Sequence, residues 1–394
     1  MSRTPAASSG GAAAPPLVGA PPPGGAAALF TRDILQVFAR AARVTAGHPV
    51  QAFALARALV RQRAAARLRA AVGAQESLSV PPIAIYSITN RCNLHCAGCY
   101  AHAHHRTAPE LDAAALRDVV EQCREMGIWI VLVAGGEPLT RPEIFATLAG
   151  CPEITFPLFT NGLLMETDTI AWFRRHRHVI PVLSLEGRHL DTDARRGGGV
   201  YRAVLSRMGD LRRAGIFFGT SLAITSANFD TVMTRTFMRE MIAEGSRLFF
   251  LVDYVPIEPG TESLIPTDEQ RGRSLTLLDE FKRTLPALFV AFPGDERHLG
   301  GCMAAGRGFI HISADGRVEP CPAAPFSDVS VTNVSLRQAL HSPFLRAIRE
   351  SDVHLTELEG GCALWARREW VRSLLQSPAP VDASAHISAA PPAA

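Results

Sequence analysis

Short apolar runs alternate with amphipathic segments over the central part of the chain. The runs that predict strands cover residues 83–88, 128–134, 154–159, 179–185, 217–224 and 248–255. Apolar residues at helical spacing predict helices near 110–126, 142–150, 166–176, 200–214 and 229–244. Repeated strand–helix units form parallel sheets, because each helix carries the chain back to the start of the next strand. We therefore expect an α/β fold, a partial (β/α)6 TIM-like barrel, over residues 81–265.

The pattern changes after the predicted barrel. A helical stretch from Thr267 to Leu288 occupies most of a connecting region, residues 266–300. The apolar run 309–312, the pair Asp315-Gly316 and residues 317–319 then predict a hairpin, since Asp-Gly favours a tight turn between two strands. Helices are expected near 335–349 and 361–375. Residues 301–376 are thus predicted to form a small α+β C-terminal module.

The N-terminal part combines a low-complexity tail with a helical extension over residues 29–80. Residues 1–28 and 377–394 are nearly all Ala, Pro, Gly and Ser, which predicts disordered tails. Within the extension, apolar residues recur at steps of three and four, opposite a row of arginines: Val50, Phe53, Ala56, Val60, Ala64 and Leu68 against Arg57, Arg61, Arg63 and Arg67. This stripe favours docking of the helix on the folded unit, with weak contact to a membrane surface as the alternative.

Composition and charge exclude several classes of protein. Of 394 residues, 47% are hydrophobic and 20% are charged, which is typical of a globular chain. The net charge of +3 is too balanced to indicate nucleic-acid binding. The sequence shows neither an apolar run long enough to span a membrane nor a secretion signal, so a cytoplasmic location is predicted. Eight cysteines in so large a chain then favour reduced thiols over disulfides.

Three cysteines lie within eight residues directly after the first predicted strand. Cys92, Cys96 and Cys99 can hold three irons of a four-iron cluster and leave the fourth iron open. A zinc site is the alternative, since several histidines are close in sequence: His95, His102, His104 and His105.

The CxxxCxxC spacing after the first strand of a partial barrel resembles the signature of the radical SAM superfamily. The resemblance implies a [4Fe-4S] cluster whose open iron chelates the amino and carboxylate groups of S-adenosylmethionine (SAM). In that family an electron splits SAM to a 5′-deoxyadenosyl radical, which abstracts hydrogen from the substrate. A flavodoxin- or ferredoxin-type electron donor is implied as well.

Motifs at the ends of the next three strands match the same family. Gly135-Gly136-Glu137-Pro138 corresponds to the GGEP segment that holds the methionine amino group. The resemblance assigns the SAM contacts to these residues: Gly135, Gly136, Glu137, Asn161, Ser184, Glu186 and Arg196. One feature departs from the pattern, because many members carry an aromatic before the third cysteine, where this chain has Gly98 and places Tyr100 after it. The usual adenine contact is therefore in question.

Three further cysteines surround the predicted hairpin. Cys302, Cys321 and Cys362 resemble the ligands of SPASM or twitch domains, which bind auxiliary iron–sulfur clusters. Full SPASM domains carry about seven cysteines, so three imply at most one auxiliary cluster. The alternative is that all three are buried core residues. Cys123 and Cys151 stand apart from other cysteines, which predicts core packing.

The substrate is left open between two chemical classes. SPASM-like cysteines suggest a peptide substrate, whereas the Cys96-Ala97-Gly98-Cys99 variant and the basic helix also resemble radical SAM enzymes acting on hopanoids, other lipids or small molecules. A zinc-binding or electron-transfer protein without SAM chemistry is the alternative from another class. Candidate substrate contacts follow the sixth strand or lie on the hairpin: Tyr254, Glu258, Glu262, His311 and Glu319. Trp365 and Trp370 are expected in the core.

Overall fold

A computed structural model describes residues 49–103, 108–292, 301–355 and 362–376. The predicted tails, residues 29–48 of the helical extension, and His104 and His105 lie outside these residues.

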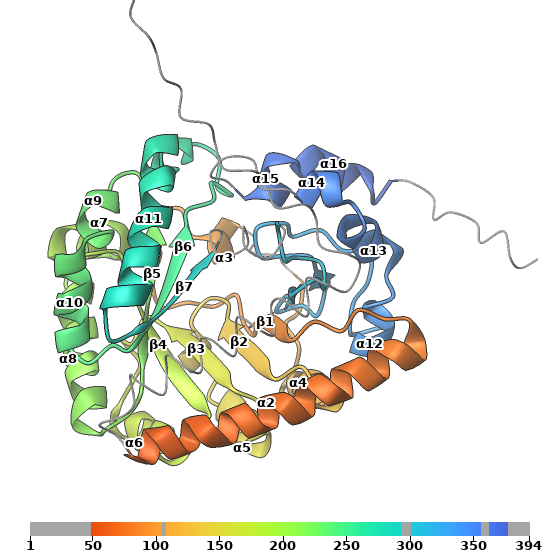
Figure 1. Cartoon of the computed structure of the whole chain (residues 1–394), viewed down its shortest axis with the longest axis horizontal. Helices are drawn as coiled ribbons and strands as arrows, with labels where there is room; N and C mark the ends of the chain where they lie inside the picture. The colour runs from red at the N-terminus through yellow and green to blue at the C-terminus, as the bar shows by residue number, and fades with distance from the viewer. Residues whose placement is uncertain (1–48, 104–107, 293–300, 356–361, 377–394) are drawn as a thin grey trace, which may run out of the picture.

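In the described part of the chain, nine strands form one curled, mostly parallel sheet in the order β7-β6-β5-β4-β3-β2-β1-β8-β9, with helices along its outer side (Figure 1). The α/β half-barrel predicted from the alternating pattern is confirmed. The strands are β1 (Ile83–Ser87), β2 (Ile130–Ala134), β3 (Phe156–Thr160), β4 (Val179–Leu185), β5 (Gly219–Ile224), β6 (Leu248–Asp253), β7 (Leu288–Phe292), β8 (Phe309–Ile312) and β9 (Val318–Glu319).

Helices form within the predicted stretches 110–126, 142–150, 166–176 and 200–214, the stretch 229–244 divides into two helices, and those at 100–103 and 189–196 were not predicted. Those of the barrel are α3 (Tyr100–Ala103), α4 (Ala113–Glu125), α5 (Ile144–Gly150), α6 (Thr167–Arg175), α7 (His189–Arg196), α8 (Val200–Arg213), α9 (Phe229–Val232), α10 (Arg235–Ala243) and α11 (Asp268–Thr284). The C-terminal part holds α12 (Leu336–Ala339), α13 (Pro343–Arg349), α14 (Asp352–Leu355), α15 (Ala363–Ala366) and α16 (Arg368–Ser373). Two short 3₁₀ helices, η1 (Pro138–Thr140) and η2 (Glu262–Leu264), follow β2 and β6.

The core lies between the sheet and its helices. Val131, Leu132 and Val133 of β2 are all buried, as a strand covered on both faces requires. Parallel pairing brings the carboxyl ends of β1, β2, β3 and β4 to one edge of the sheet. The polar residues that follow these strands are thereby gathered on one side of the molecule.

Two strands differ from the predicted elements. The helical stretch predicted to reach Leu288 ends at Thr284, and Leu288–Phe292 forms β7, which pairs with β6. The predicted hairpin forms as β8 and β9, but β8 also pairs in parallel with β1. It thus extends the barrel sheet, a long-range pairing that local patterns do not reveal.

Helix α2 (Pro49–Glu76) docks on the fold, but through the face opposite to the one predicted. Gln62, Arg69 and Val72 are buried, and the Arg69 guanidinium donates to the Gly127 carbonyl at 2.6 Å. The predicted docking stripe faces outward, with Phe53 65%, Val60 67% and Leu68 40% exposed. The side that packs instead carries Arg61 and Arg69, which donate to the backbone carbonyls of Pro152 and Gly127. None of the described helices has the length and apolar character to cross a membrane.

Candidate active site at the cysteine loop

The loop from Thr89 to Cys99 leaves β1 at the carboxyl edge of the sheet and leads into α3. Cys92, Cys96 and Cys99 are half-buried thiols, and none is in a disulfide. Burial raises the pKa of the Cys96 thiol, an effect that the guanidinium of Arg196 opposes. Within the described residues, no three His, Cys, Asp or Glu side chains converge as they would around a single metal ion.

The backbone of Gly136 and Glu137, just after β2, holds this loop against the sheet. The Gly136 N–H donates to the Thr89 carbonyl at 2.7 Å, and the Glu137 N–H donates to the Arg91 carbonyl at 2.8 Å. A Cβ on Gly136 would overlap the Arg91 carbonyl oxygen and lie 2.6 Å from its carbon. Close approach to the loop's own backbone therefore already requires glycine at this position.

Glu137 joins the ends of β2 and β3. Its side chain is 1% exposed and accepts from the Leu139 N–H at 3.0 Å, the Thr160 hydroxyl at 2.8 Å and the Asn161 N–H at 2.7 Å. Burial raises the pKa of this carboxyl, and the two backbone N–H groups oppose the rise. The carboxylate thus positions the strand end that carries Asn161.

Asn161 extends this connection to the cysteine loop. Its amide nitrogen donates to Oδ1 of Asn93 at 2.7 Å and lies 3.9 Å from Sγ of Cys92, while its oxygen accepts from the Leu163 N–H at 3.0 Å. The residue therefore fixes the loop between the first two cysteines.

Glu186, after β4, anchors the other end of the loop. Its Oε1 accepts from Arg195 at 2.6 Å and from Arg196 Nε at 2.8 Å, and Arg195 Nε also donates to the Ala97 carbonyl at 3.0 Å. Although burial alone would lower the pKa of Arg196, the negative charges of Glu186 and Cys96 raise it above its ordinary value. The second oxygen, Oε2, is buried without a hydrogen-bond partner among the described residues. A donor group of a ligand can complete it.

Tyr254, from the end of β6, contacts the loop at Gly98. Gly98 has φ +63°, and a Cβ there would overlap the Tyr254 hydroxyl and lie 2.9 Å from Cζ. The Arg195 guanidinium lies 5.7 Å from the centre of the Tyr254 ring. Like Oε2 of Glu186, the Tyr254 hydroxyl is buried without a hydrogen-bond partner among the described residues. The space beside Gly98 is thus filled by an aromatic ring from the segment that follows β6.

A buried chain of polar side chains lies behind the loop. The Tyr100 hydroxyl bonds to Ser87 and to the Gly135 backbone, and burial raises the pKa of Tyr100 to about 12. Ser87 lies 2.9 Å from Nε2 of His311, whose Nδ1 lies 2.8 Å from Glu319. His311 and Glu319, expected at the substrate, are instead engaged within the sheet at 5% and 3% side-chain exposure.

The remaining candidates are more dispersed. Ser184 is half-buried at the end of β4, opposite Ser221 of β5. Glu258 and Glu262 are exposed on the segment after β6. Trp365 and Trp370, expected in the core, are half-buried, and of the two Trp370 packs against the core.

The C-terminal cysteines lie on segments that are bonded to one another. The Cys302 N–H donates to the Leu355 carbonyl of α14 at 2.8 Å, and α14 contacts α15, which follows Cys362. The Ala305 N–H donates at 3.1 Å to the carbonyl of Pro320, which precedes Cys321. Cys302 is buried, and the other two are half-buried.

Cys123 and Cys151 pack in the core, as predicted. Burial raises the pKa of the Cys123 thiol to about 12. Sequence patterns did not identify the positioning roles of Asn93, Arg195 and Tyr254. The Arg-Arg pair at 195–196 was the available signal for Arg195, and Tyr254 was singled out only as a candidate substrate contact after the sixth strand.

The residues of the loop fit an iron–sulfur cluster with an organic ligand beside it. Three partly exposed thiols supply the donors, and Arg195 and Arg196 can balance their negative charge. The buried oxygens without partners, on Glu186 and Tyr254, mark polar positions that the described chain leaves unsatisfied next to these thiols.

Comparisons with known proteins agree with this site. Residues 86–234 match the family model of the radical SAM superfamily. An AdoMet-dependent heme synthase of Methanosarcina barkeri is 26% identical over 321 residues, 73% of this chain and 88% of the relative. A PqqA peptide cyclase of Gluconobacter oxydans is 27% identical over 271 residues, 66% and 75% of the two chains.

Solved structures share the fold. Streptococcus suis SuiB bound to S-adenosylmethionine superposes with a TM-score of 0.60 at 18% identity, covering 75% of this chain and 76% of SuiB. Native anSMEcpe with bound AdoMet gives 0.54 at 15% identity, covering 71% and 84%. The family match decides against a zinc or electron-transfer protein without SAM chemistry. The chain is an enzyme of the radical SAM superfamily.

Proposed function

We propose that this chain is a peptide-modifying radical SAM enzyme with its primary [4Fe-4S] cluster on Cys92, Cys96 and Cys99. The observation that carries the proposal is the convergence of three strand ends on the cysteine loop through Gly136, Asn161 and Glu186. When bound, the cluster and SAM supply a 5′-deoxyadenosyl radical that abstracts a hydrogen atom. The protein's task is to fix both groups and exclude water.

The residues assigned to SAM divide into two roles. Oε2 of Glu186 is proposed to accept a hydrogen bond from SAM, with Ser184, Arg196 and the backbone of Gly135 and Gly136 as further contacts. Glu137 and Asn161 are proposed to act as positioning residues, since their side chains are engaged with protein groups.

The peptide substrate is favoured by the relatives. A PqqA peptide cyclase and mycofactocin maturases are among them, and one matched SuiB structure holds the precursor peptide SuiA. A heme synthase is also among them, so a small molecule is the second candidate.

An auxiliary cluster and two partners complete the proposal. Bonded segments carry Cys302, Cys321 and Cys362 within the proposed module of residues 301–376, which supports one further cluster. A flavodoxin- or ferredoxin-type donor and a cytoplasmic location are proposed from the chemistry.

The outward stripe of α2, with Phe53, Val60 and Arg57 and without acidic residues before Glu76, is proposed to make weak contact with an anionic membrane surface.

A SAM-cleavage assay tests the central proposal. Anaerobically reconstituted, reduced protein is expected to convert SAM to 5′-deoxyadenosine, and the C92A/C96A/C99A variant is expected to lose this activity while keeping its helical circular dichroism. The C123A variant is the control, because this thiol packs in the core. Undiminished turnover by the triple variant would contradict the proposal.

A further inference from the structure

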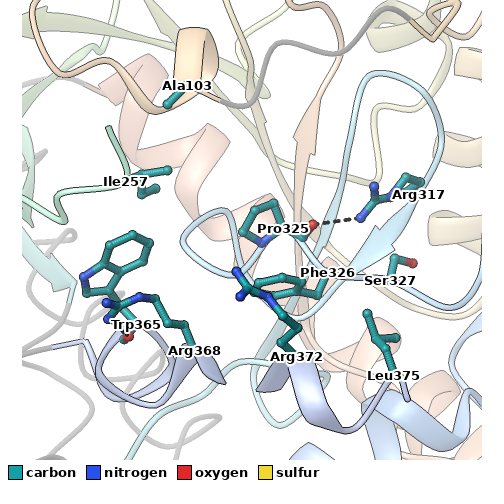
Figure 2. A pocket seen from close by; sticks show the side chains of 10 residues that line it. All are labelled: Ala103, Ile257, Arg317, Pro325, Phe326, Ser327, Trp365, Arg368, Arg372 and Leu375. Carbon is teal, nitrogen blue, oxygen red and sulfur yellow. Dashed lines mark hydrogen bonds between the residues drawn. The ribbon is translucent and has the colours of Figure 1, made fainter. Parts of the chain in front are cut away.

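A pocket of about 490 Å³ opens between α3, which follows the cysteine loop, and the C-terminal helices α15 and α16 (Figure 2). Ala103 lines one side, and its N–H donates to the Cys99 carbonyl at 3.0 Å, one helical turn away. Ile257 follows Tyr254 by three residues, and Trp365 follows Cys362 by three. The pocket therefore lies next to segments that carry the proposed ligands of both clusters.

Its lining combines aromatic faces with guanidinium groups. Arg368 lies 4.9 Å from the Trp365 ring centre, and Arg372 lies 5.7 Å from that of Phe326. An arginine that lies against a ring keeps its in-plane N–H donors available for a planar anion. Flat apolar surface and anion donors thus occur side by side (Figure 2).

Arg317, the third arginine of the lining, is held in place by two protein groups. Arg317 donates to the Pro325 carbonyl at 2.8 Å and lies 3.2 Å from the buried carboxylate of Glu319, which His311 also contacts. Arg372 pairs on the surface with Glu369 at 3.2 Å, whereas in the described part of the chain Arg368 has no carboxylate partner. None of the ten lining residues is acidic, so the pocket favours a negative ligand.

We infer that this pocket binds a carboxylate-bearing segment of the peptide substrate, with an aromatic or aliphatic side chain beside the carboxylate. The carboxylate meets Arg368 and Arg372, and the neighbouring side chain packs between Trp365 and Phe326. This inference rests on the proposed function and names the substrate class of the same site. An acidic side chain and a free C-terminus are two sources of the same group.

Calorimetric titration of the full-length, reconstituted protein tests the inference with three peptides. The probes are acetyl-Ala-Glu-Phe-Glu-Ala-amide, its Gln counterpart, and the Gln peptide with a free C-terminus. At least one carboxylate peptide is expected to bind about tenfold more tightly than the Gln amide, with an advantage that falls as salt rises. Tighter binding of the Glu peptide identifies an acidic side chain as the source of the carboxylate, and tighter binding of the Gln peptide with a free C-terminus identifies the chain terminus.

Variants localise the binding. R368Q/R372Q is expected to remove the tenfold preference, whereas R212Q/R283Q, which changes two exposed arginines on α8 and α11, is expected to keep it. Equal affinity for all three peptides, or an unchanged preference in R368Q/R372Q, overturns the inference. SAM cleavage without peptide, measured on the same samples, separates the two proposals: lost cleavage with retained preference contradicts the proposed function alone.

Discussion

The phenol of Tyr254 fills the space in which a side chain at Gly98 would lie. A Cβ on Gly98 would sit 2.9 Å from Cζ of Tyr254 and overlap its hydroxyl, although the two residues are far apart in sequence. The residue before the third cysteine and the residue after β6 are therefore coupled by volume. A large side chain at either position requires a small one at the other.

The first prediction tests this coupling. Gly98→Ala is expected to displace the loop and lower iron incorporation severalfold, and Gly98→Ala/Tyr254→Phe is expected to recover part of it by removing the hydroxyl. Gly215→Ala is the control, since Gly215 has the same φ of +63° but no atom within 4 Å of its added Cβ. That control should lose only about 1–2 kcal/mol of stability from backbone strain. Equal iron content in both single variants would contradict the coupling.

The second prediction concerns Gly136, and it differs from what the GGEP motif alone predicts. Contact with SAM alone would predict weaker SAM binding with an intact cluster. Because a Cβ at Gly136 would overlap the Arg91 carbonyl, Gly136→Ala is expected to lower both iron content and SAM affinity. Gly150→Ala, at the open end of α5, should change neither. Iron quantification with SAM titration checks both, and full iron content in Gly136→Ala would count against loop displacement.

The third prediction concerns the carboxylate shared by two arginines. Glu186→Ala leaves Arg195 and Arg196, at 16% and 13% side-chain exposure, without their carboxylate and should cost about 3–5 kcal/mol in the free energy of unfolding. Glu240→Ala breaks the exposed Arg188 pair and should cost less than about 1 kcal/mol. Urea unfolding of both apo variants measures the difference. Similar losses of stability in the two variants would show that the buried ion pairs of Glu186 stabilise the fold no more than the exposed pair of Glu240 does.

The fourth prediction counts iron. If each cluster is of the four-iron type, fully reconstituted protein should hold about eight irons, and C302A/C321A/C362A about four. The variant should still cleave SAM, because the primary ligands lie on a separate loop. Wild-type protein that never exceeds about four irons would assign these cysteines to the core.

The fifth prediction concerns the outward face of α2. Vesicles containing phosphatidylglycerol should co-sediment the protein weakly at low salt, and F53S/V60S should reduce the bound fraction severalfold. Leu190→Ser, at a residue 79% exposed on α7, is the matched control. Equal binding of both variants would show that this face of α2 is not the contact, and binding to neutral vesicles alone would refute an anionic membrane surface as its occupant.

How much of the structure can be predicted from the sequence depends on how far apart in sequence the interacting residues lie. Strand β4 was predicted with its full extent, 179–185, because burial on both faces gives a continuous apolar run. The run 288–292 is just as apolar and follows Pro286, which lies just past the end of α11, but the helix was extended through this boundary to Leu288, so β7 was missed. Motifs located Cys92, Gly136 and Glu186, whereas the contacts of Tyr254 and Arg195 depend on tertiary geometry that no local spacing encodes.

The parallel pairing of β8 with β1 has a consequence for the order of synthesis. During translation, the strand that carries the cysteine loop has one neighbour, β2, once residue 134 has emerged, but it stays a sheet edge until Ile312 is made. An unpaired edge recruits other strands, so a nascent or truncated chain that stops before residue 309 exposes a site for misassociation next to its cysteines. The C-terminal third is therefore a sealing element for the cysteine-loop strand, and the enzyme cannot be shortened to its barrel without reopening that edge.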